Sequence, residues 1–219
     1  MLPSTDAESS APSLWDVSAR ELLTRTASAD PTPGGGSVAA ISGAFGLALV
    51  TMALAVSLKG KSASDDLKTL HHEAGELLNR LLPHPDADVT AFQGYMDALA
   101  LPKSDEGQRA TRRSAMQSAA RSATEAPLSA ARDLLAGLEL AQRAAVLSHK
   151  NVVSDVGAGA ALLAGALHAE LLTVDINLSS LPAEERSAAY TERTHLAEAA
   201  RQQDTRVASL VQARLTRPD

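Results

Sequence analysis

Residues suited to chemistry stand where long apolar segments begin. The segment PTPGGGS at 31–37 precedes an uncharged run from 38 to 58, which predicts a rigid turn opening directly onto one long helix. The first amides of a helix lack internal partners and lie at the positive end of its dipole. Glycines would let an anionic or strongly hydrogen-bonding group approach these amides, and a side chain at Gly35 is expected to damage folding or binding. Close packing of two helices explains the same glycines equally well.

Asp155 is the second candidate, because it opens an Ala- and Gly-rich segment expected to be a helix as far as about Thr173. Ser154 could cap this helix, and Asp155 would then only complement the dipole. In a partly apolar setting, the carboxylate would instead have a raised pKa and exchange a proton near neutral pH. Twenty residues of continuous helix would separate Asp155 from Asp175 by about 30 Å, so the two could meet only across an antiparallel two-fold contact.

Metal and nucleotide chemistry find no support in the spacing of residues. The histidines form no H-E-x-x-H or other ligand pattern, and the absence of cysteine excludes a thiol nucleophile and a cysteine zinc site. The sequence at 60–62, GKS, is like the end of a phosphate-binding P-loop. However, the required earlier glycine is Ala55, and the preceding segment is predicted to be a helix and not a strand. We therefore expect no metal.

The composition predicts the elements that position these residues. Hydrophobic residues make up 45% of the 219 residues but aromatic residues only 2%, which favours an all-α, single-domain bundle of closely packed helices around a long buried central helix at 38–58. That helix exceeds the roughly 20 residues that span a bilayer. It has few large aliphatic residues and no aromatic belt, and no second span is of equal quality, so we expect a soluble protein. Helices are expected at about 15–28, 38–58, 64–82, 86–101, 109–124, 128–147, 155–173 and 183–215.

The charge and the N-terminus bear on partners and location. A net charge of −6 and a pI near 5.5 argue against nucleic acid as a partner. Residues 1–13 are predicted to be a disordered tail without the apolar core of a signal peptide, and residues 14–219 to form the helical domain. We expect a cytoplasmic protein without a membrane partner.

Four motifs in order, from Trp15 to about Tyr190, resemble the cyclodeaminase/cyclohydrolase family: PTPGGGSVAAISGA, DVTAFQGYMDALALPK, the turn at 126–128, and NVVSDVGAGA with LLTVDINL. The resemblance implies an all-α homodimer with a tetrahydrofolate derivative as substrate, bound in a cleft near the subunit interface, and no metal. It implies one of two reactions: hydrolysis of 5,10-methenyltetrahydrofolate to 10-formyltetrahydrofolate, or release of ammonia from 5-formiminotetrahydrofolate. Both pass through a tetrahedral carbon joined to N5 and N10.

The resemblance also implies site residues. Asp155 matches the family's aspartate in its (S/T)-D motif and would be the catalytic carboxylate, stabilising the cationic methenyl bridge and moving a proton. The residues implied to line or shape the folate cleft are Thr32, Gly34, Gly35, Gly36, Ser37, Lys61, Asp88, Lys103 and Asn177.

The sequence departs from the family pattern near these positions. The stretch 58–64 reads LKGKSAS where a T-x-G-K-K-K-Y-like segment is usual, so the later lysines that would attract folate carboxylates are missing. His149 and Thr173 stand where asparagines are common. The sequence favours a cyclohydrolase, because no formiminotransferase domain is present. The alternatives are a cyclodeaminase and a helical dimer that binds folate or another ligand without turning it over.

Overall fold

The computed structural model describes residues 12–60 and 64–216, and every regular element in these two stretches is helical. This confirms the predicted all-α class. The α-helices are α1 (Ala19–Thr26), α2 (Gly35–Leu58), α3 (Asp65–Leu81), α4 (His84–Ala100), α5 (Glu106–Leu147), α6 (Val153–Asn177) and α7 (Ala183–Leu215). Two short 3-10 helices, η1 (Lys150–Val152) and η2 (Leu178–Ser180), flank α6.

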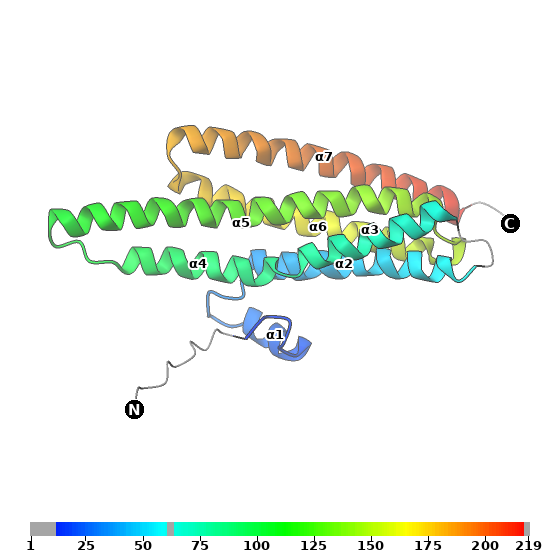
Figure 1. The fold of residues 1–219 in the computed structure, drawn as a ribbon, viewed down its shortest axis with the longest axis horizontal. Helices are drawn as coiled ribbons and strands as arrows, with labels where there is room; N and C mark the ends of the chain where they lie inside the picture. The colour runs from blue at the N-terminus through cyan, green and yellow to red at the C-terminus, as the bar shows by residue number, and fades with distance from the viewer. Residues whose placement is uncertain (1–11, 61–63, 217–219) are drawn as a thin grey trace, which may run out of the picture.

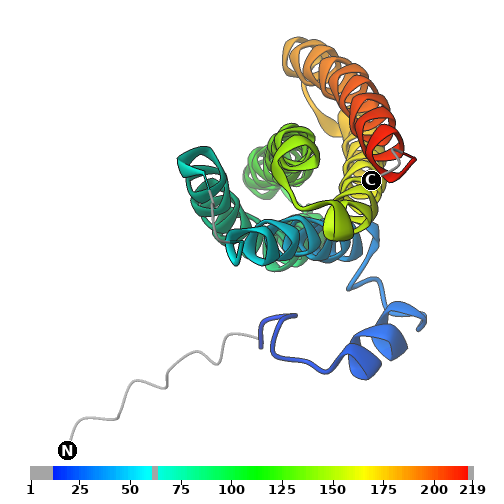
Figure 2. The ribbon, with the colours of Figure 1, turned by 90° about the vertical axis from the view of Figure 1, so that its right-hand side faces the viewer.

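The helices α2 to α7 form an elongated bundle, and α1 lies apart from it on the side of α2 (Figure 1). Seen end-on, α3, α2, α6 and α7 form an arc around α5 (Figure 2). Small residues let α2 and α6 touch along their backbones: a Cβ added to Gly46 would lie 2.7 Å from the carbonyl oxygen of Gly159. This close approach explains how a core of Leu, Ala and Val closes almost without aromatic side chains.

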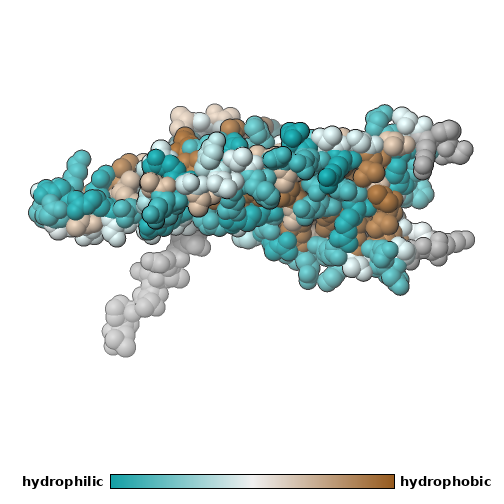
Figure 3. Space-filling view, turned by 90° about the horizontal axis from the view of Figure 1, so that it is seen from above, coloured by the Kyte–Doolittle hydropathy of each residue, from teal (hydrophilic) through white to brown (hydrophobic). Residues whose placement is uncertain are grey.

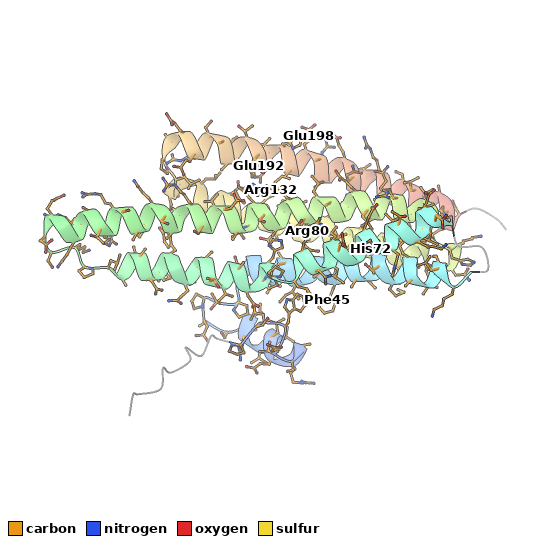
Figure 4. All side chains as sticks on the ribbon, in the orientation of Figure 1. Phe45, His72, Arg80, Arg132, Glu192 and Glu198 are labelled. Atoms are coloured by element: carbon orange, nitrogen blue, oxygen red, sulfur yellow. The ribbon has the colours of Figure 1, made fainter. Side chains whose placement is uncertain are left out.

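Helix α2 is apolar on all sides but is not buried on all sides, which corrects the prediction of a fully buried central helix. Six of its exposed or half-buried residues recur at alternating spacings of four and three and form the α2 stripe: Val38, Ser42, Phe45, Leu49, Met52 and Val56. Phe45, 60% exposed, points toward the segment before α1, where its ring meets that of Trp15 edge-on at 6.3 Å (Figure 4). The face over α5 and α7 is instead largely hydrophilic (Figure 3).

The prediction of two helices at 109–124 and 128–147 is wrong, because α5 runs through Pro127 without a break. A proline has no N–H, so the carbonyl four residues earlier, that of Ala123, loses its helical partner. The side-chain amide of Asn177 in α6 donates to this carbonyl at 2.7 Å and replaces the lost bond. A buried carbonyl without a partner would cost about 1–3 kcal/mol, so this contact lets α5 continue.

The described residues include two stretches long and apolar enough to cross a membrane, Gly35–Leu58 and Lys150–Ser180. The second has the lower mean hydropathy, in agreement with the expectation that no second span is of equal quality. The most apolar window of the first stretch is 56% buried inside the bundle, and that of the second is 39% buried. Of the predicted N-terminal tail, residues 1–11 lie outside the described residues, and Ser13 donates a hydrogen bond to Asp86 of α4 at 2.5 Å.

Candidate active site

A cleft of about 420 Å³ opens where the glycine loop before α2 meets α4 and the C-terminal end of α6. We call it the glycine-loop cleft. Its main lining residues are Thr32, Gly34, Gly35 and Gly36 of the loop, Asp88, Phe92, Tyr95 and Met96 of α4, Ala123 of α5, and Thr173, Ile176 and Asn177 of α6. Six of the residues that the resemblance implied therefore lie together here.

Asp88 is fixed in the wall of this cleft by the first turn of α2. Its Oδ2 accepts hydrogen bonds from the Ser37 backbone N–H at 2.9 Å and from the Ser37 hydroxyl at 2.6 Å. Ser37 is fully buried, so it supports the cleft from beneath and does not line it. Gly34 offers no side chain to cap α2, and the carboxylate of Asp88 instead accepts the Ser37 N–H in the first turn. One anionic group at this helix end is thus a side chain of the protein.

Gly36 is the glycine on which this arrangement depends. A Cβ at Gly36 would lie 2.3 Å from Oδ1 of Asp88, whereas a Cβ at Gly35 would meet nothing within 4 Å. No described residue has a positive φ, so the loop needs glycine for close approach and not for backbone conformation. The strict packing requirement therefore lies at Gly36. Because Gly35 lines the cleft, the expected effect of a larger side chain there on ligand binding stays a prediction.

We expect Gly36→Ala to lower the free energy of unfolding by about 1–3 kcal/mol, because Asp88 must move away from Ser37. Gly35→Ala is the matched control, since it makes the same chemical change one position earlier and points into open space. Urea unfolding of both variants measures the difference. Equal stability of the two variants would show that Asp88 is not held against the α2 backbone as described.

Asn177 both replaces the hydrogen bond that α5 loses at Pro127 and lines the cleft. Its amide nitrogen is committed to Ala123, and both residues line the cleft. The amide nitrogen is therefore held in one place, and the side-chain carbonyl of Asn177 has the capacity to accept a hydrogen bond from a ligand.

The α4 wall presents Asp88, Phe92 and Tyr95 at positions i, i+4 and i+7 of one helix face. Apart from the weakly acidic Tyr95, Asp88 is the only ionisable side chain among the described lining residues. Two aromatic rings beside a single carboxylate suit a flat ligand that carries positive charge or donates hydrogen bonds. Of these three residues, the sequence analysis implied Asp88 as a site residue and did not single out Tyr95.

Glu170 is a buried carboxyl group of α6, and the sequence analysis missed it because it described the segment after Asp155 only as Ala- and Gly-rich. It is 2% exposed and lies one turn before Thr173 on α6. Burial first, and the negative charge of Asp88 second, raise the pKa of the Glu170 carboxyl to about 9. Glu170 is the only acidic residue between 156 and 174, which was the available signal.

Asp155 and Lys103 are not brought to this cleft within one chain. Asp155 is in the first turn of α6 and Asn177 is its last residue, so about 33 Å of helix separates them. Lys103 is exposed in the connection between α4 and α5 and does not line the cleft. Lys61 lies outside the described residues. His149 lies near Asp155, where its backbone N–H donates to the Ser57 hydroxyl at 2.7 Å.

An exposed, mostly apolar line on α6 connects Asp155 to the cleft. We call it the α6 stripe, whose residues recur at alternating spacings of three and four: Asp155, Ala158, Leu162, Gly165, Ala169, Leu172 and Ile176. Leu162, Gly165 and Ala169 border a groove of about 510 Å³ together with Val38 and Ser42 of the α2 stripe. This α2–α6 groove shares Gly34 and Gly35 with the cleft. Asp155 and the cleft thus occupy opposite ends of one surface.

The family model described as formiminotransferase-cyclodeaminase matches residues 18–195. The chain belongs to this family. Its resemblance to the family, stated above from four motifs, is therefore confirmed over most of its length.

Named members of the family include both enzyme types. A methenyltetrahydrofolate cyclohydrolase of Methylorubrum extorquens is 36% identical over 73% of this chain and 78% of its own. The formimidoyltransferase-cyclodeaminase of Gallus gallus is 32% identical over 83% of this chain, which spans only 34% of that longer protein. The crystal structure of formiminotetrahydrofolate cyclodeaminase from Thermotoga maritima superposes with a TM-score of 0.80 at 25% identity, covering 91% of this chain and 98% of that one.

Proposed function

We propose that this chain is a cytoplasmic, metal-free enzyme of folate one-carbon metabolism that hydrolyses 5,10-methenyltetrahydrofolate to 10-formyltetrahydrofolate. The observation that carries the proposal is the single fixed carboxylate, Asp88, in an otherwise apolar and aromatic cleft. The methenyl bridge of that substrate is a delocalised cation in a flat ring system. The family member that is 36% identical to this chain is named a cyclohydrolase for the same compound.

In this proposal each wall of the cleft has a separate task. The carboxylate of Asp88 stabilises the cationic bridge, while Phe92 and Tyr95 pack against the flat rings. Asn177 and Thr32 provide hydrogen-bonding groups at the edges of the ligand. Because Ser37 holds Asp88 before substrate arrives, little reorganisation accompanies binding.

We further propose a homodimer in which Asp155 of the partner subunit completes the cleft. Positions 155 and 175 lie ten residues on either side of Gly165, so an antiparallel two-fold contact through Gly165 brings the start of one α6 beside the end of the other. Gly165 has open space in front of it, and the stripe beside it is apolar, with Leu172 54% exposed and Ile176 76% exposed. Such a contact buries this surface and supplies the carboxylate that one chain lacks.

Asp155 then performs the proton transfers. It accepts a proton from the attacking water as the C–O bond forms to the bridging carbon. It returns that proton to N5 as the C–N5 bond breaks. The remaining hydroxyl proton leaves to solvent as the C=O bond forms, so the formyl group stays on N10 and one proton is released overall. The cationic charge of the bridge disappears in the first step, and no other co-reactant is needed.

Cyclodeamination is the second candidate, favoured by the TM-score of 0.80 to a structure named formiminotetrahydrofolate cyclodeaminase. It passes through the same tetrahedral carbon, with nitrogen in place of oxygen as the third heteroatom. The third candidate is ligand binding without turnover. Thr173, one of the departures from the family pattern, lines the cleft and motivates this alternative.

The test is near-ultraviolet absorbance of the purified protein with each folate in turn. Loss of the methenyl band faster than its spontaneous decay is expected. Appearance of that band from 5-formiminotetrahydrofolate would instead assign the cyclodeaminase reaction. Binding of both compounds without any change in the band would leave only the non-catalytic alternative.

A further inference from the structure

Thr32 lines both the glycine-loop cleft and a second cavity of about 670 Å³. We call the second one the N-terminal cavity, because the segment before α1 forms part of its wall. Its lining residues are Pro12, Ser13, Leu14, Asp16, Arg25, Thr32, Pro33, Asp86, Val89 and Thr90. A ligand longer than the cleft can therefore extend past Thr32 into this cavity.

The wall of the N-terminal cavity is held in place by hydrogen bonds to α3 and α4. The Ser13 hydroxyl donates to one carboxylate oxygen of Asp86 at 2.5 Å, and the Leu14 backbone N–H donates to the other at 2.8 Å. The indole N–H of Trp15 donates to the carbonyl of Leu82 at 2.7 Å. Both oxygens of Asp86 thus have partners within the protein, and the cavity is formed before a ligand arrives.

Arg25 reaches this cavity from α1, a helix that has no buried residue and lies apart from the bundle (Figures 1 and 2). Its Nε donates to Oε1 of Glu21 at 2.8 Å, one turn earlier on the same helix. No described residue accepts a hydrogen bond from its two terminal nitrogens, and its side chain is 42% exposed. Glu21 therefore orients the guanidinium group, while the terminal N–H groups remain available to a carboxylate.

Arg25 is also the only positively charged residue among the described lining residues of the cleft and of the three cavities that share residues with it. A cavity of about 710 Å³ between α4 and α5 shares Ala91 with the cleft, but its charged residue is Asp97. The α2–α6 groove has Asp30 instead. A negatively charged group is thus repelled along these two routes and attracted only along the one that leads to Arg25.

We propose that Arg25 binds the carboxylate end of the ligand whose cationic ring lies against Asp88. This inference rests on the proposed function, because a methenyltetrahydrofolate carries its positive charge on the bridge and its glutamate carboxylates at the opposite end. The benzoyl group that joins the two ends passes Thr32, so each charge of the ligand meets an opposite charge of the protein. Asp16 and Asp86 line the same cavity, so the attraction is local to the guanidinium group and does not favour a long polyanion.

Arg25 lies away from the reacting carbon in this arrangement. Its contact with the tail is the same in the bound substrate and in the transition state. Such uniform binding lowers KM and leaves kcat unchanged. Arg25 is therefore a binding residue and not a catalytic one.

The site is tested first by calorimetric titration with two compounds that the proposed reaction does not consume, tetrahydrofolate and tetrahydropteroate, which lacks the glutamate. Wild type should bind tetrahydrofolate about tenfold more tightly than tetrahydropteroate. Arg25→Gln should lose this preference while its affinity for tetrahydropteroate stays the same. Arg25→Lys keeps the charge but not the paired donors, and should restore the preference only in part.

Two control variants on α1 separate this role from a general effect on the helix. Arg20→Gln removes a positive charge that does not line the cavity, and Glu21→Gln removes the ion pair but keeps the guanidinium group. Both should keep the preference for tetrahydrofolate. A preference that persists in Arg25→Gln overturns the proposal, and so does an equal loss of affinity for both compounds.

Kinetics with 5,10-methenyltetrahydrofolate distinguish this inference from the proposed function. Arg25→Gln should raise KM about tenfold with kcat unchanged, and a fall in kcat at constant KM would contradict the binding role. If tetrahydrofolate binds through Arg25 but the methenyl compound is not hydrolysed, the proposed reaction fails and the Arg25 site stands. If wild type binds neither tetrahydrofolate nor tetrahydropteroate, both proposals fail.

Discussion

An equal mixture of Asp155→Asn and Asp88→Asn chains, each inactive alone, should recover about a quarter of wild-type turnover after subunit exchange. In the proposed antiparallel dimer, each cleft takes Asp88 from one chain and Asp155 from the other. A mixed dimer therefore has one doubly altered cleft and one intact cleft. Half of the dimers in a random mixture are mixed, and half of their clefts are intact, which gives the expected recovery.

Turnover in the mixed sample is compared with turnover in each variant alone, and native mass spectrometry measures the fraction of mixed dimers. The control exchanges two differently tagged Asp155→Asn chains, which should recover nothing. Mixed dimers without recovered activity would refute a shared cleft. Full activity of Asp155→Asn by itself would remove this residue from the mechanism altogether.

Glu170→Gln should raise the free energy of unfolding by an amount on the order of 3 kcal/mol near pH 7. The folded state holds Glu170 neutral with a pKa of about 9, while in the unfolded chain the Glu170 carboxyl ionises with its ordinary pKa of 4.5. The folded state thus binds one more proton between these two pH values, and wild-type stability falls as pH rises through this window. Glutamine does not titrate, so the free energy of unfolding of the variant does not fall in this pH window on account of residue 170.

Denaturant unfolding of the wild type and Glu170→Gln at several pH values measures this difference. It should be small below pH 4.5, grow between pH 4.5 and pH 9, and stay constant above that. Glu198→Gln on the exposed side of α7 is the control for the same chemical change and should show no such growth (Figure 4). A difference independent of pH would mean that Glu170 is ionised in the folded protein.

Local signals in the sequence were sufficient for most of the helices. The predicted bounds of α7, 183–215, agree with the structure, and the proline pair around His84 ends α3 and begins α4 as expected. Pro127 misled the prediction because its compensating donor, Asn177, lies fifty residues further along the chain. A breaking signal is local, whereas the contact that overrides it is tertiary.

The candidate site could be predicted where its residues belong to continuous motifs. The loop glycines and Asp88 were identified from such motifs, and they meet in the cleft. The contribution of Asp155 could not be placed, because helix length separates it from the cleft within one chain. Glu170 was missed for another reason: its chemistry comes from burial and from Asp88, and neither is visible in the residues beside it.

The contact between Asn177 and Ala123 makes one side chain serve two structures, since it completes α5 opposite Pro127 and also lines the cleft. A substitution of Asn177 that alters ligand specificity would therefore also weaken α5, the longest described helix of the molecule. If Pro127 is replaced first, the new residue supplies a backbone N–H to the Ala123 carbonyl. Asn177 can then be substituted without leaving that carbonyl unpaired. Substitution of Asn177 is thus expected to cost less stability once Pro127 has been replaced than while the proline is present.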